Sequence, residues 1–198
     1  MKQIILIHGG TTYSSYDRFI DDLKNKTIHI ERLASPPTWR DKLQASLGVD
    51  YQILRPSMPN STNAKYSEWK LWFERVSEVA ADDCTLIGHS LGAIFLAKYL
   101  SENQFPKRIA ATILVAAPFN DETKEDLTDF KLSSIGELFS QQAGKVTFLH
   151  GLDDPVVSIE ELNRYKQQLP SAEYIIMPAP DHFMRSEFTE IVEVIKNI

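Results

Sequence analysis

A serine lies between two glycines in the segment Gly88-His89-Ser90-Leu91-Gly92, which follows the apolar residues 85–87 and precedes a long apolar stretch. This spacing predicts a sharp turn from a strand into a helix, with the Ser90 side chain above the sheet and no room for a Cβ atom at either glycine. The helix directs free N–H groups toward the space above the hydroxyl, where they would stabilise an oxyanion. The pattern indicates nucleophilic chemistry at Ser90, although a tight turn with an ordinary serine is the alternative for the motif alone.

A serine hydroxyl is a weak nucleophile at neutral pH, so it needs a base to take its proton and an acid to orient that base. Two segments that follow predicted strands supply such residues, Asp153-Asp154 and Asp181-His182. The chain order of serine, acid and histidine is typical of hydrolases with this serine motif. We therefore expect His182 to be the base that serves Ser90.

Two carboxylates compete for the orienting role, and a third, Asp181, is discounted. Asp154 directly precedes Pro-Val-Val, the position that usually carries the acid in loops of this type, whereas Asp153 has the place of a turn residue that caps local N–H groups. Asp181 is adjacent to His182, and the side chains of neighbouring residues diverge. We expect Asp154 to orient His182.

A second glycine-rich segment, His8-Gly9-Gly10-Thr11, follows the first predicted strand. Two glycines let the backbone approach a reacting carbonyl group closely and turn an N–H toward it. We assign the two oxyanion donors to the backbone N–H groups of Gly10 and Leu91. A glycine turn after a strand is common in isolation, so this assignment depends on the other parts of the site.

The remaining histidines have structural interpretations. His8 is expected to shape its loop, His89 to pack beside the serine turn, His150 to be a satisfied structural residue and His29 to be solvated. No two histidines have the spacing of metal ligands. We therefore predict neither a metal nor an organic cofactor.

The elements that must position these residues alternate along the chain. Strands are expected at residues 4–7, 51–54, 85–87, 112–116, 146–149 and 174–177, and helices at 38–47, 66–80, 91–103 and 187–196. Most of the strands are continuously apolar, as in a sheet covered on both faces, and the alternation favours a parallel sheet in an α/β fold. The carboxyl ends of parallel strands share one edge, where ligands bind, so we expect the reactive residues to meet there.

The composition restricts the possible partners. The 198 residues suit a single domain, residues 1–198, and the 43% of apolar residues provide a core that needs no disulfide or metal. A net charge of −6 without a dense cluster of Lys and Arg argues against nucleic acid or an anionic membrane surface as partner. Cys84 is the only cysteine, so no intrachain disulfide can form. The apolar segments are too short for a signal peptide or a membrane helix, and we expect a cytoplasmic protein.

Together these motifs resemble the α/β-hydrolase superfamily over essentially the whole chain, and within it the small serine hydrolases of the retinoblastoma-binding-protein and YdeN-like type. The resemblance lies in the motif around Ser90, in Asp153-Asp154-Pro155, in His182-Phe183, and in Ser57-Met58-Pro59 followed by Tyr66 and Trp69. It implies a minimal three-layer αβα fold that lacks the superfamily's first two strands, with six parallel strands in the order 2-1-3-4-5-6. It also implies Ser-His-Asp hydrolysis of small acyl substrates.

Two features depart from that family. Asp181 stands where a glycine usually precedes the histidine, and residues 29–48 are longer than expected between the first helix and the second strand. We expect this long segment to form a small flap near the pocket. Residues 119–145, where lids of this fold usually lie, are too few for a large cap, so we expect an open and shallow site.

Residues near these loops are candidates for the walls of the substrate site: Thr11, Tyr13, Met58, Phe119, Val156 and Phe183. An acidic run is interpreted as a solvated face: Asp121, Glu122, Glu125, Asp126 and Asp129. If this run borders the site, its charge disfavours anionic substrates.

The sequence therefore predicts an esterase-like hydrolase that cleaves small carboxylic esters, thioesters or amides through an acyl-enzyme on Ser90. Haloalkane dehalogenation is disfavoured because it needs a carboxylate where Ser90 stands, whereas cofactor-free perhydrolysis uses the same three residues and stays open. A protein-binding module of the same fold, with little or no activity, is the alternative from another class of function.

Overall fold

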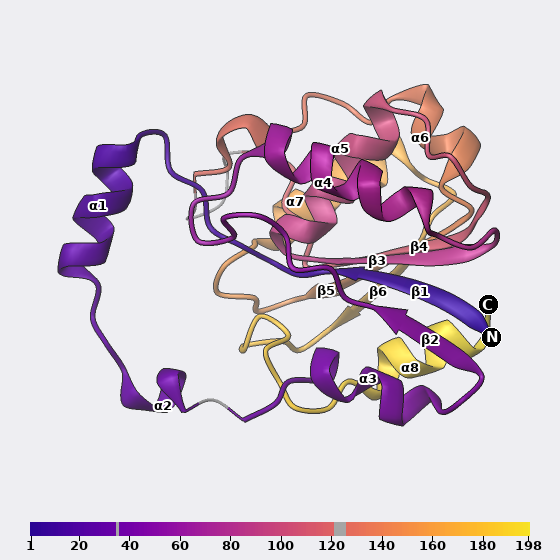
Figure 1. Cartoon of the computed structure of the whole chain (residues 1–198), viewed down its shortest axis with the longest axis horizontal. Coiled ribbons are helices and arrows are strands. Elements are labelled where there is room, and N and C mark those ends of the chain that lie inside the picture. Colours follow the sequence, from indigo (N-terminus) through magenta and orange to yellow (C-terminus); the bar gives the residue numbers. More distant parts are fainter. Residues whose placement is uncertain (35, 121–125) are drawn as a thin grey trace.

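The computed structural model describes residues 1–34, 36–120 and 126–198, and one sheet of six parallel strands forms its centre (Figure 1). The strands are β1 Lys2–Ile7, β2 Tyr51–Leu54, β3 Cys84–His89, β4 Ile109–Val115, β5 Lys145–Gly151 and β6 Glu173–Met177. They lie in the order β2-β1-β3-β4-β5-β6, and every neighbouring pair is parallel. The predicted α/β fold and its strand order are confirmed.

Burial follows the position of each strand in the sheet. Every residue of the inner strand β3 is buried, whereas the edge strands β2 and β6 contain no buried residue. An inner strand of a parallel sheet is covered on both faces, so a continuously apolar sequence suits it. The turn at Ser90 therefore follows a strand that is buried along its whole length.

Helices cover both faces of the sheet (Figure 1). The helices on one face are α4 Tyr66–Glu78, α5 Leu91–Glu102, α6 Glu137–Gln142 and α7 Ile159–Gln168, with the short 3-10 helix Thr128–Phe130 beside them. The helices on the other face are α3 Trp39–Leu47 and α8 Thr189–Lys196. The three layers match the prediction, and the four helices with predicted bounds differ from them by at most two residues.

Aromatic rings fix α4 against α5. Trp69 and Phe73 of α4 are fully buried, and their ring centroids lie 5.6 and 5.4 Å from that of Phe95 of α5, in edge-to-face geometry. Such pairs contribute about 0.5–1.5 kcal/mol each beyond the burial of their area. Because α5 begins at Leu91, this packing holds the N-terminus of the helix directly behind Ser90.

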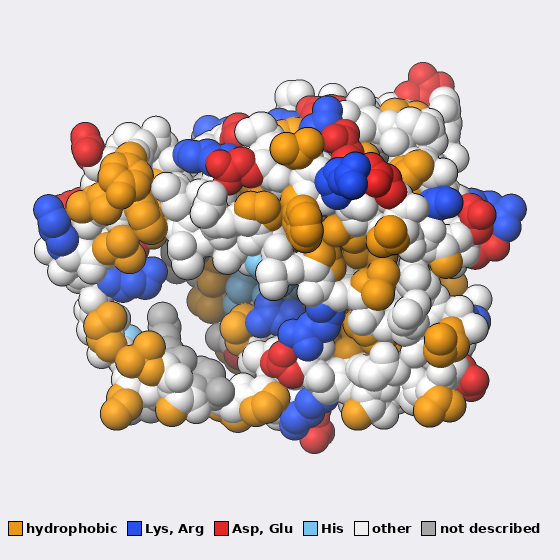
Figure 2. Space-filling model, in the orientation of Figure 1, with side chains coloured by type: hydrophobic (Ala, Val, Ile, Leu, Met, Phe, Trp, Pro, Cys, Tyr) orange, Lys and Arg blue, Asp and Glu red, His pale blue; other side chains and the backbone are white. Residues whose placement is uncertain are grey.

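Two helices between β1 and β2, α1 Tyr16–Asn25 and α2 Ile30–Leu33, stand apart from the sheet (Figure 1). No residue of α1 is buried, and Ser15 caps this helix by accepting the Arg18 N–H at 3.2 Å. Figure 2 shows an opening between these helices and the rest of the molecule. The chain thus leaves the body after β1 and returns to it at α3, which accounts for the length of this connection.

The helix α3 packs into the body and holds the loop that follows β6. The buried Trp39 donates its indole N–H to the Phe183 carbonyl at 2.8 Å and its backbone N–H to the Arg185 carbonyl at 2.9 Å. Its ring also meets that of Phe188 edge to face, with centroids 5.4 Å apart. The second half of the expected flap is therefore a helix fixed to the C-terminal loop, and it ends, as predicted, at Leu47.

Replacing Trp39 with phenylalanine should lower the free energy of unfolding by about 1–3 kcal/mol, because the Phe183 carbonyl loses its buried donor and the smaller ring leaves a void. Trp72→Phe makes the same chemical change at a residue of α4 that is 44% exposed, and its effect should stay within about 0.5 kcal/mol. Urea unfolding followed by far-UV circular dichroism measures both variants. Equal losses in the two variants would contradict the role given to α3.

Candidate active site

The chain turns sharply at Ser90, between the end of β3 and the start of α5. Ser90 has φ of 55° and ψ of −121°, a conformation that is rare outside glycine and costs backbone energy. Its N–H donates to the Val115 carbonyl of β4 at 2.9 Å, which helps to hold it there. A Cβ atom at Gly88 would lie 2.5 Å from the Gly92 carbonyl oxygen, and one at Gly92 would collide with the carbonyl oxygen of Ile7. Both glycines of the motif are therefore required by the close packing around the turn.

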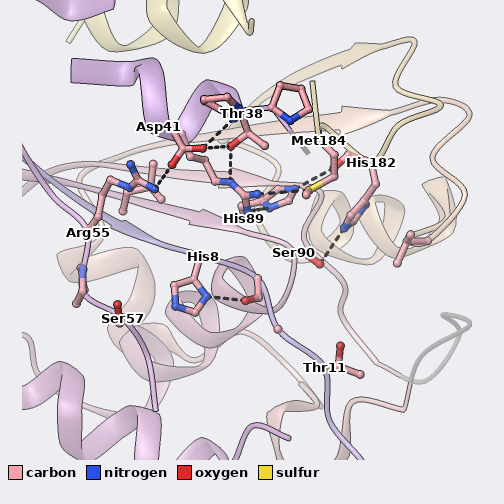
Figure 3. A pocket seen from close by; sticks show the side chains of 18 residues that line it. His8, Thr11, Thr38, Asp41, Arg55, Ser57, His89, Ser90, His182 and Met184 are labelled. Atoms are coloured by element: carbon pink, nitrogen blue, oxygen red, sulfur yellow. Dashed lines mark hydrogen bonds and ion pairs between the residues drawn. The ribbon is translucent and has the colours of Figure 1, made fainter. Parts of the chain in front are cut away.

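Three side chains form one hydrogen-bonded chain at the carboxyl edge of the sheet. The Nε2 atom of His182 lies 2.9 Å from Oγ of Ser90 (Figure 3), and its Nδ1 atom lies 2.8 and 2.9 Å from the two carboxylate oxygens of Asp154. An ionised carboxylate only accepts, so Nδ1 carries the ring proton and Nε2 accepts the proton of the serine hydroxyl. The His182 side chain is 11% exposed and that of Asp154 is fully buried. This arrangement can remove the Ser90 proton while it excludes bulk water from the acid.

The surroundings of Asp154 keep it ionised. Burial by itself would raise the pKa of its carboxyl group, but the hydrogen bond with His182 and those from the N–H groups of Val156 and Val157, at 2.8 and 3.0 Å, outweigh that effect. The pKa of Asp154 therefore lies below its ordinary value. A carboxylate that is charged at neutral pH can stabilise an imidazolium at His182.

The two other candidate acids have different partners. Asp153 accepts the Ala179 N–H at 2.6 Å and thereby ties the loop after β5 to the loop after β6. Asp181 forms an ion pair with Arg185 at 2.7 Å, and the hydrogen bond from that guanidinium lowers the pKa of Asp181. The structure thus brings Asp154, and neither Asp153 nor Asp181, to the imidazole of His182.

The glycine loop after β1 passes beside Ser90, and His8 orients it. The Nε2 atom of His8 accepts the backbone N–H of Met58 at 2.9 Å. Its Nδ1 therefore carries the ring proton and donates to the Gly9 carbonyl at 2.6 Å. In a trans peptide the C=O and the following N–H point in opposite directions, so the Gly10 N–H faces away from His8. A Cβ atom at Gly9 would lie only 3.2 Å from Cβ of Ser90. The Gly10 N–H and that of Leu91, the first residue of α5, belong to the two segments that flank Ser90.

Ser90 and His182 open onto a cleft with a volume of about 1010 Å³. Its walls come from residues 8–11, from residues 36–41 around the start of α3, and from residues 55–57 after β2, with Met184 beside His182. Figure 3 shows these side chains around the Ser90–His182 pair. The segment expected to be a flap therefore does contribute to the pocket, as a fixed wall.

Three of the predicted wall residues lie in the core instead. Met58, Phe119 and Phe183 are 4%, 3% and 0% exposed, so they do not line this cleft. Phe119 packs against Tyr165 with ring centroids 5.0 Å apart, and Phe183 against Phe188 at 4.9 Å. The prediction that these three residues contact the substrate is therefore wrong, because their side chains are buried in the core.

Of the other three predicted wall residues, two line the cleft and one does not. Thr11 and Val156 line the cleft, as predicted. Tyr13 lies outside its lining and donates its hydroxyl group to Asp22 of α1 at 2.6 Å. Tyr13 thus helps to attach α1 rather than to form the wall of the cleft.

The polar wall around α3 was missed by the sequence analysis. Arg40, Asp41 and Thr38 line the cleft from one segment, and Arg55 lines it from the segment after β2. The unusual length of residues 29–48 was a signal that this part of the chain could approach the pocket. Nothing in its sequence distinguished these side chains from ordinary solvated residues.

His89 connects this wall to the loop of His182. It lies in the core, and its Nδ1 faces Nη1 of Arg40 at 3.1 Å while its Nε2 lies 3.0 Å from the His182 carbonyl oxygen. Burial, with a smaller contribution from the Arg40 charge, places the pKa of His89 well below its ordinary value. The ring is therefore neutral at neutral pH, accepts from Arg40 and donates to the His182 carbonyl.

His150 and Cys84 lie in the core. The Nε2 atom of His150 lies 3.2 and 3.1 Å from the carbonyl oxygens of Val157 and Ser158, but its buried Nδ1 has no hydrogen-bond partner among the described residues, so the prediction of a fully satisfied histidine is only partly right. Cys84 is a buried free thiol whose pKa is raised to about 11 by burial. In the described parts of the chain, no group of His, Cys, Asp and Glu side chains could hold a metal ion. No helix there is long and apolar enough to cross a membrane.

The acidic run does not border the cleft where the structure describes it. Asp121, Glu122 and Glu125 lie outside the described residues. Asp129 accepts the Tyr66 N–H at 3.1 Å, and the Asp126 carbonyl accepts the hydroxyl group of Thr12. Neither Asp126 nor Asp129 lines the cleft.

Several solved structures share this fold. The ydeN gene product from B. subtilis is similar over 100% of this chain and 98% of its own, with a TM-score of 0.72 and 18% identity. The thioesterase domain from the curacin biosynthetic pathway is similar over 98% of this chain and 91% of its own, with a TM-score of 0.62 and 12% identity. An esterase domain from a Rhodothermus marinus protein is similar over 98% and 82%, with a TM-score of 0.60 and 14% identity. At these identities the similarity establishes the α/β-hydrolase fold.

The comparison of sequences points to one family. No curated protein sequence is similar enough to this chain to count as a relative. The sequence profile of the serine hydrolases, by contrast, matches residues 33–195, a range that contains Ser90, Asp154 and His182. Because the match extends over most of the chain, this protein belongs to the serine hydrolase family.

Proposed function

We propose that the protein is an esterase-like hydrolase that cleaves small carboxylic esters, thioesters or amides through an acyl-enzyme on Ser90. The observation that carries this proposal is the hydrogen-bonded chain from Ser90 through His182 to the buried Asp154, which opens onto a cleft. Nucleophile, base and orienting acid are the three parts that acyl transfer by a serine requires.

The steps follow from the proton positions. Nε2 of His182 takes the hydroxyl proton as Oγ of Ser90 attacks the substrate carbonyl carbon, and Asp154 stabilises the resulting imidazolium. The tetrahedral intermediate then breaks its bond to the leaving group, which receives the proton from His182. Water then attacks the acyl-Ser90 ester while His182 takes its proton, the bond to Oγ of Ser90 breaks as His182 returns that proton to Oγ, and the carboxylic acid leaves.

The oxyanion of the intermediate is assigned to the backbone N–H groups of Gly10 and Leu91. The hydrogen bond from His8 to the Gly9 carbonyl supports this role for Gly10, because it turns the next N–H away from His8. The N-terminus of α5 supports it for Leu91, because its first N–H groups have no partner within the helix. Loss of one such donor typically costs about a hundred- to a thousand-fold in turnover.

Small acyl compounds are the substrates that the cleft supports best. None of the described residues between 119 and 145, where a lid would lie, lines it. The structurally similar proteins named above include a thioesterase domain and an esterase domain, and their shared fold supports the same class of substrate.

A fluorophosphonate probe should label the wild-type protein covalently, and Ser90→Ala should abolish the labelling, because only an activated serine attacks the probe. The control is Ser57→Ala, which removes another hydroxyl group from the same cleft and should keep the labelling. Intact-protein mass spectrometry detects the adduct, and hydrolysis of para-nitrophenyl acetate should disappear with it. A folded wild type that neither reacts nor hydrolyses the ester would favour the binding module.

Asp154→Asn should lower turnover by about ten-thousand-fold, because an amide cannot stabilise the imidazolium and favours the wrong ring tautomer of His182. Asp153→Asn should change turnover by less than about tenfold, since an amide oxygen can still accept the Ala179 N–H. Steady-state kinetics with the same ester compares the two variants. The opposite ranking would mean that Asp153 orients the base.

A further inference from the structure

The wall of the cleft carries more positive than negative side-chain charge, although the chain as a whole has a net charge of −6. Of its described lining residues, Arg40 and Arg55 are cationic and Asp41 is anionic. On the face seen in Figure 2, basic and histidine side chains gather at the hollow in the middle of the molecule. A low-dielectric cleft concentrates such a field, so one excess positive charge there matters to a ligand.

The pair of Arg55 and Asp41 is already satisfied. Nη2 of Arg55 lies 2.6 Å from Oδ1 of Asp41, and Oδ2 accepts the backbone N–H of Thr38 at 2.8 Å and its hydroxyl at 3.0 Å. The hydrogen bond from Arg55 is the main cause that lowers the pKa of Asp41. Asp41 therefore serves as the partner of Arg55 and as a cap of α3, and both of its oxygens are engaged.

Arg40 forms hydrogen bonds only with uncharged groups, and the Asp41 carboxylate acts on it through space without a direct contact. Its Nη1 faces the neutral ring of His89 at 3.1 Å, its Nη2 contacts the Met184 sulfur at 3.5 Å, and its Nε approaches the Thr38 hydroxyl at 3.4 Å. No carboxylate oxygen of the described residues lies within ion-pair distance of it. A guanidinium has five N–H donors, so one on Nη1 and one on Nη2 are left for a ligand.

A partly buried cation without a counter-ion is unfavourable, because the protein replaces water without supplying opposite charge. Burial indeed lowers the pKa of Arg40, although a guanidinium stays charged at neutral pH. This free-energy cost falls when an anion from solution or from a substrate accepts hydrogen bonds from the two free N–H groups. Arginine pairs with a carboxylate through two parallel hydrogen bonds, which suits this pair of donors.

Arg40 is also close to the reacting groups. It contacts His89, the neighbour of Ser90, and the ring centroid of His89 lies 5.1 Å from that of His182. In Figure 3, His89 lies between the Asp41–Arg55 pair and the Ser90–His182 pair. A substrate whose carbonyl group is at Ser90 can therefore extend along the cleft wall to Arg40.

We propose that Arg40 binds a carboxylate group of the substrate, so that the preferred substrates are esters or thioesters that carry one negative charge away from the scissile bond. This inference rests on the proposed hydrolase function and names its substrate class. A single excess positive charge matches a monoanionic carboxylate better than a dianionic phosphate. The acidic run would disfavour anions only if it bordered the site, and neither Asp126 nor Asp129 lines the cleft.

The test uses pairs of esters that differ only in this charge. On the acyl side, the mono-para-nitrophenyl ester of adipate is compared with its neutral N-methylamide twin. On the alcohol side, para-(carboxymethyl)phenyl acetate is compared with its own N-methylamide. Wild-type kcat/KM should favour the carboxylate compound about 10- to 100-fold in at least one pair, as expected for one charge-assisted pairing. Rates with Ser90→Ala give the spontaneous background.

Variants of Arg40 distinguish its proposed binding of a substrate carboxylate from a purely structural role beside His89. Arg40→Gln should reduce the ratio of the two kcat/KM values to about one, whereas Arg40→Lys should keep part of the preference as a point charge without the paired donors. The control is the double variant Arg55→Gln, Asp41→Asn, which removes the neighbouring ion pair, leaves the net charge of the cleft unchanged and should keep most of the preference. If Arg40 only supported His89, its loss would slow both twins by the same factor and leave their ratio unchanged.

The outcomes distinguish this inference from the hydrolase proposal. A wild type that is labelled at Ser90 and cleaves the neutral esters, but favours neither carboxylate compound, would overturn the carboxylate site alone. The same conclusion follows if Arg40→Gln keeps the wild-type ratio, or if the protein is labelled and cleaves none of the four esters. Absence of both labelling and turnover would overturn both proposals.

Discussion

The imidazole of His182 lies between Ser90 and Asp154 because the backbone at His182 is held in an unfavourable conformation. His182 and Phe183 have φ of 52° and 54°, and such left-handed residues cost on the order of 1–3 kcal/mol each. Two hydrogen bonds offset this cost, from the ring of His89 to the His182 carbonyl and from the indole of Trp39 to the Phe183 carbonyl. The position of the proposed base thus depends on a helix and a turn far from it in the chain.

The short helix α3 links this support to the charge of the cleft. Trp39 and Arg40 are consecutive and therefore point about 100° apart around the helix axis. The first enters the core and holds the loop after β6, and the second faces the cleft and contacts His89. One element inserted between β1 and β2 therefore helps to place the base and supplies the unpaired cation. In an acidic protein, a local cation of this kind defines where an anionic group can approach.

The order of the strands explains how so small a chain assembles the site. β1 pairs directly with β3, so the glycine loop after β1 lies beside the turn at Ser90. β5 pairs with β6, so the loops that carry Asp154 and His182 are neighbours. β4 lies between these two halves and holds the turn through the Val115 carbonyl. Each reactive loop follows the carboxyl end of a parallel strand, and no further domain is needed to bring them together.

Local patterns in the sequence predicted the strands and four of the helices and indicated the residues that we propose to react, because continuous apolar strands, glycine spacing around Ser90 and loop positions after strands are properties of short segments. These patterns did not distinguish residues of the cleft wall from residues of the core. Phe119 and Phe183 are apolar and suit either place, and only their packing against Tyr165 of α7 and against Phe188 at the start of α8 puts them in the core. The patterns also did not distinguish Arg40, since a charged residue at the start of a helix is typical of a solvated surface. Only the tertiary structure shows its role, because only there are its hydrogen-bond partners seen to be uncharged and its side chain seen to line the cleft.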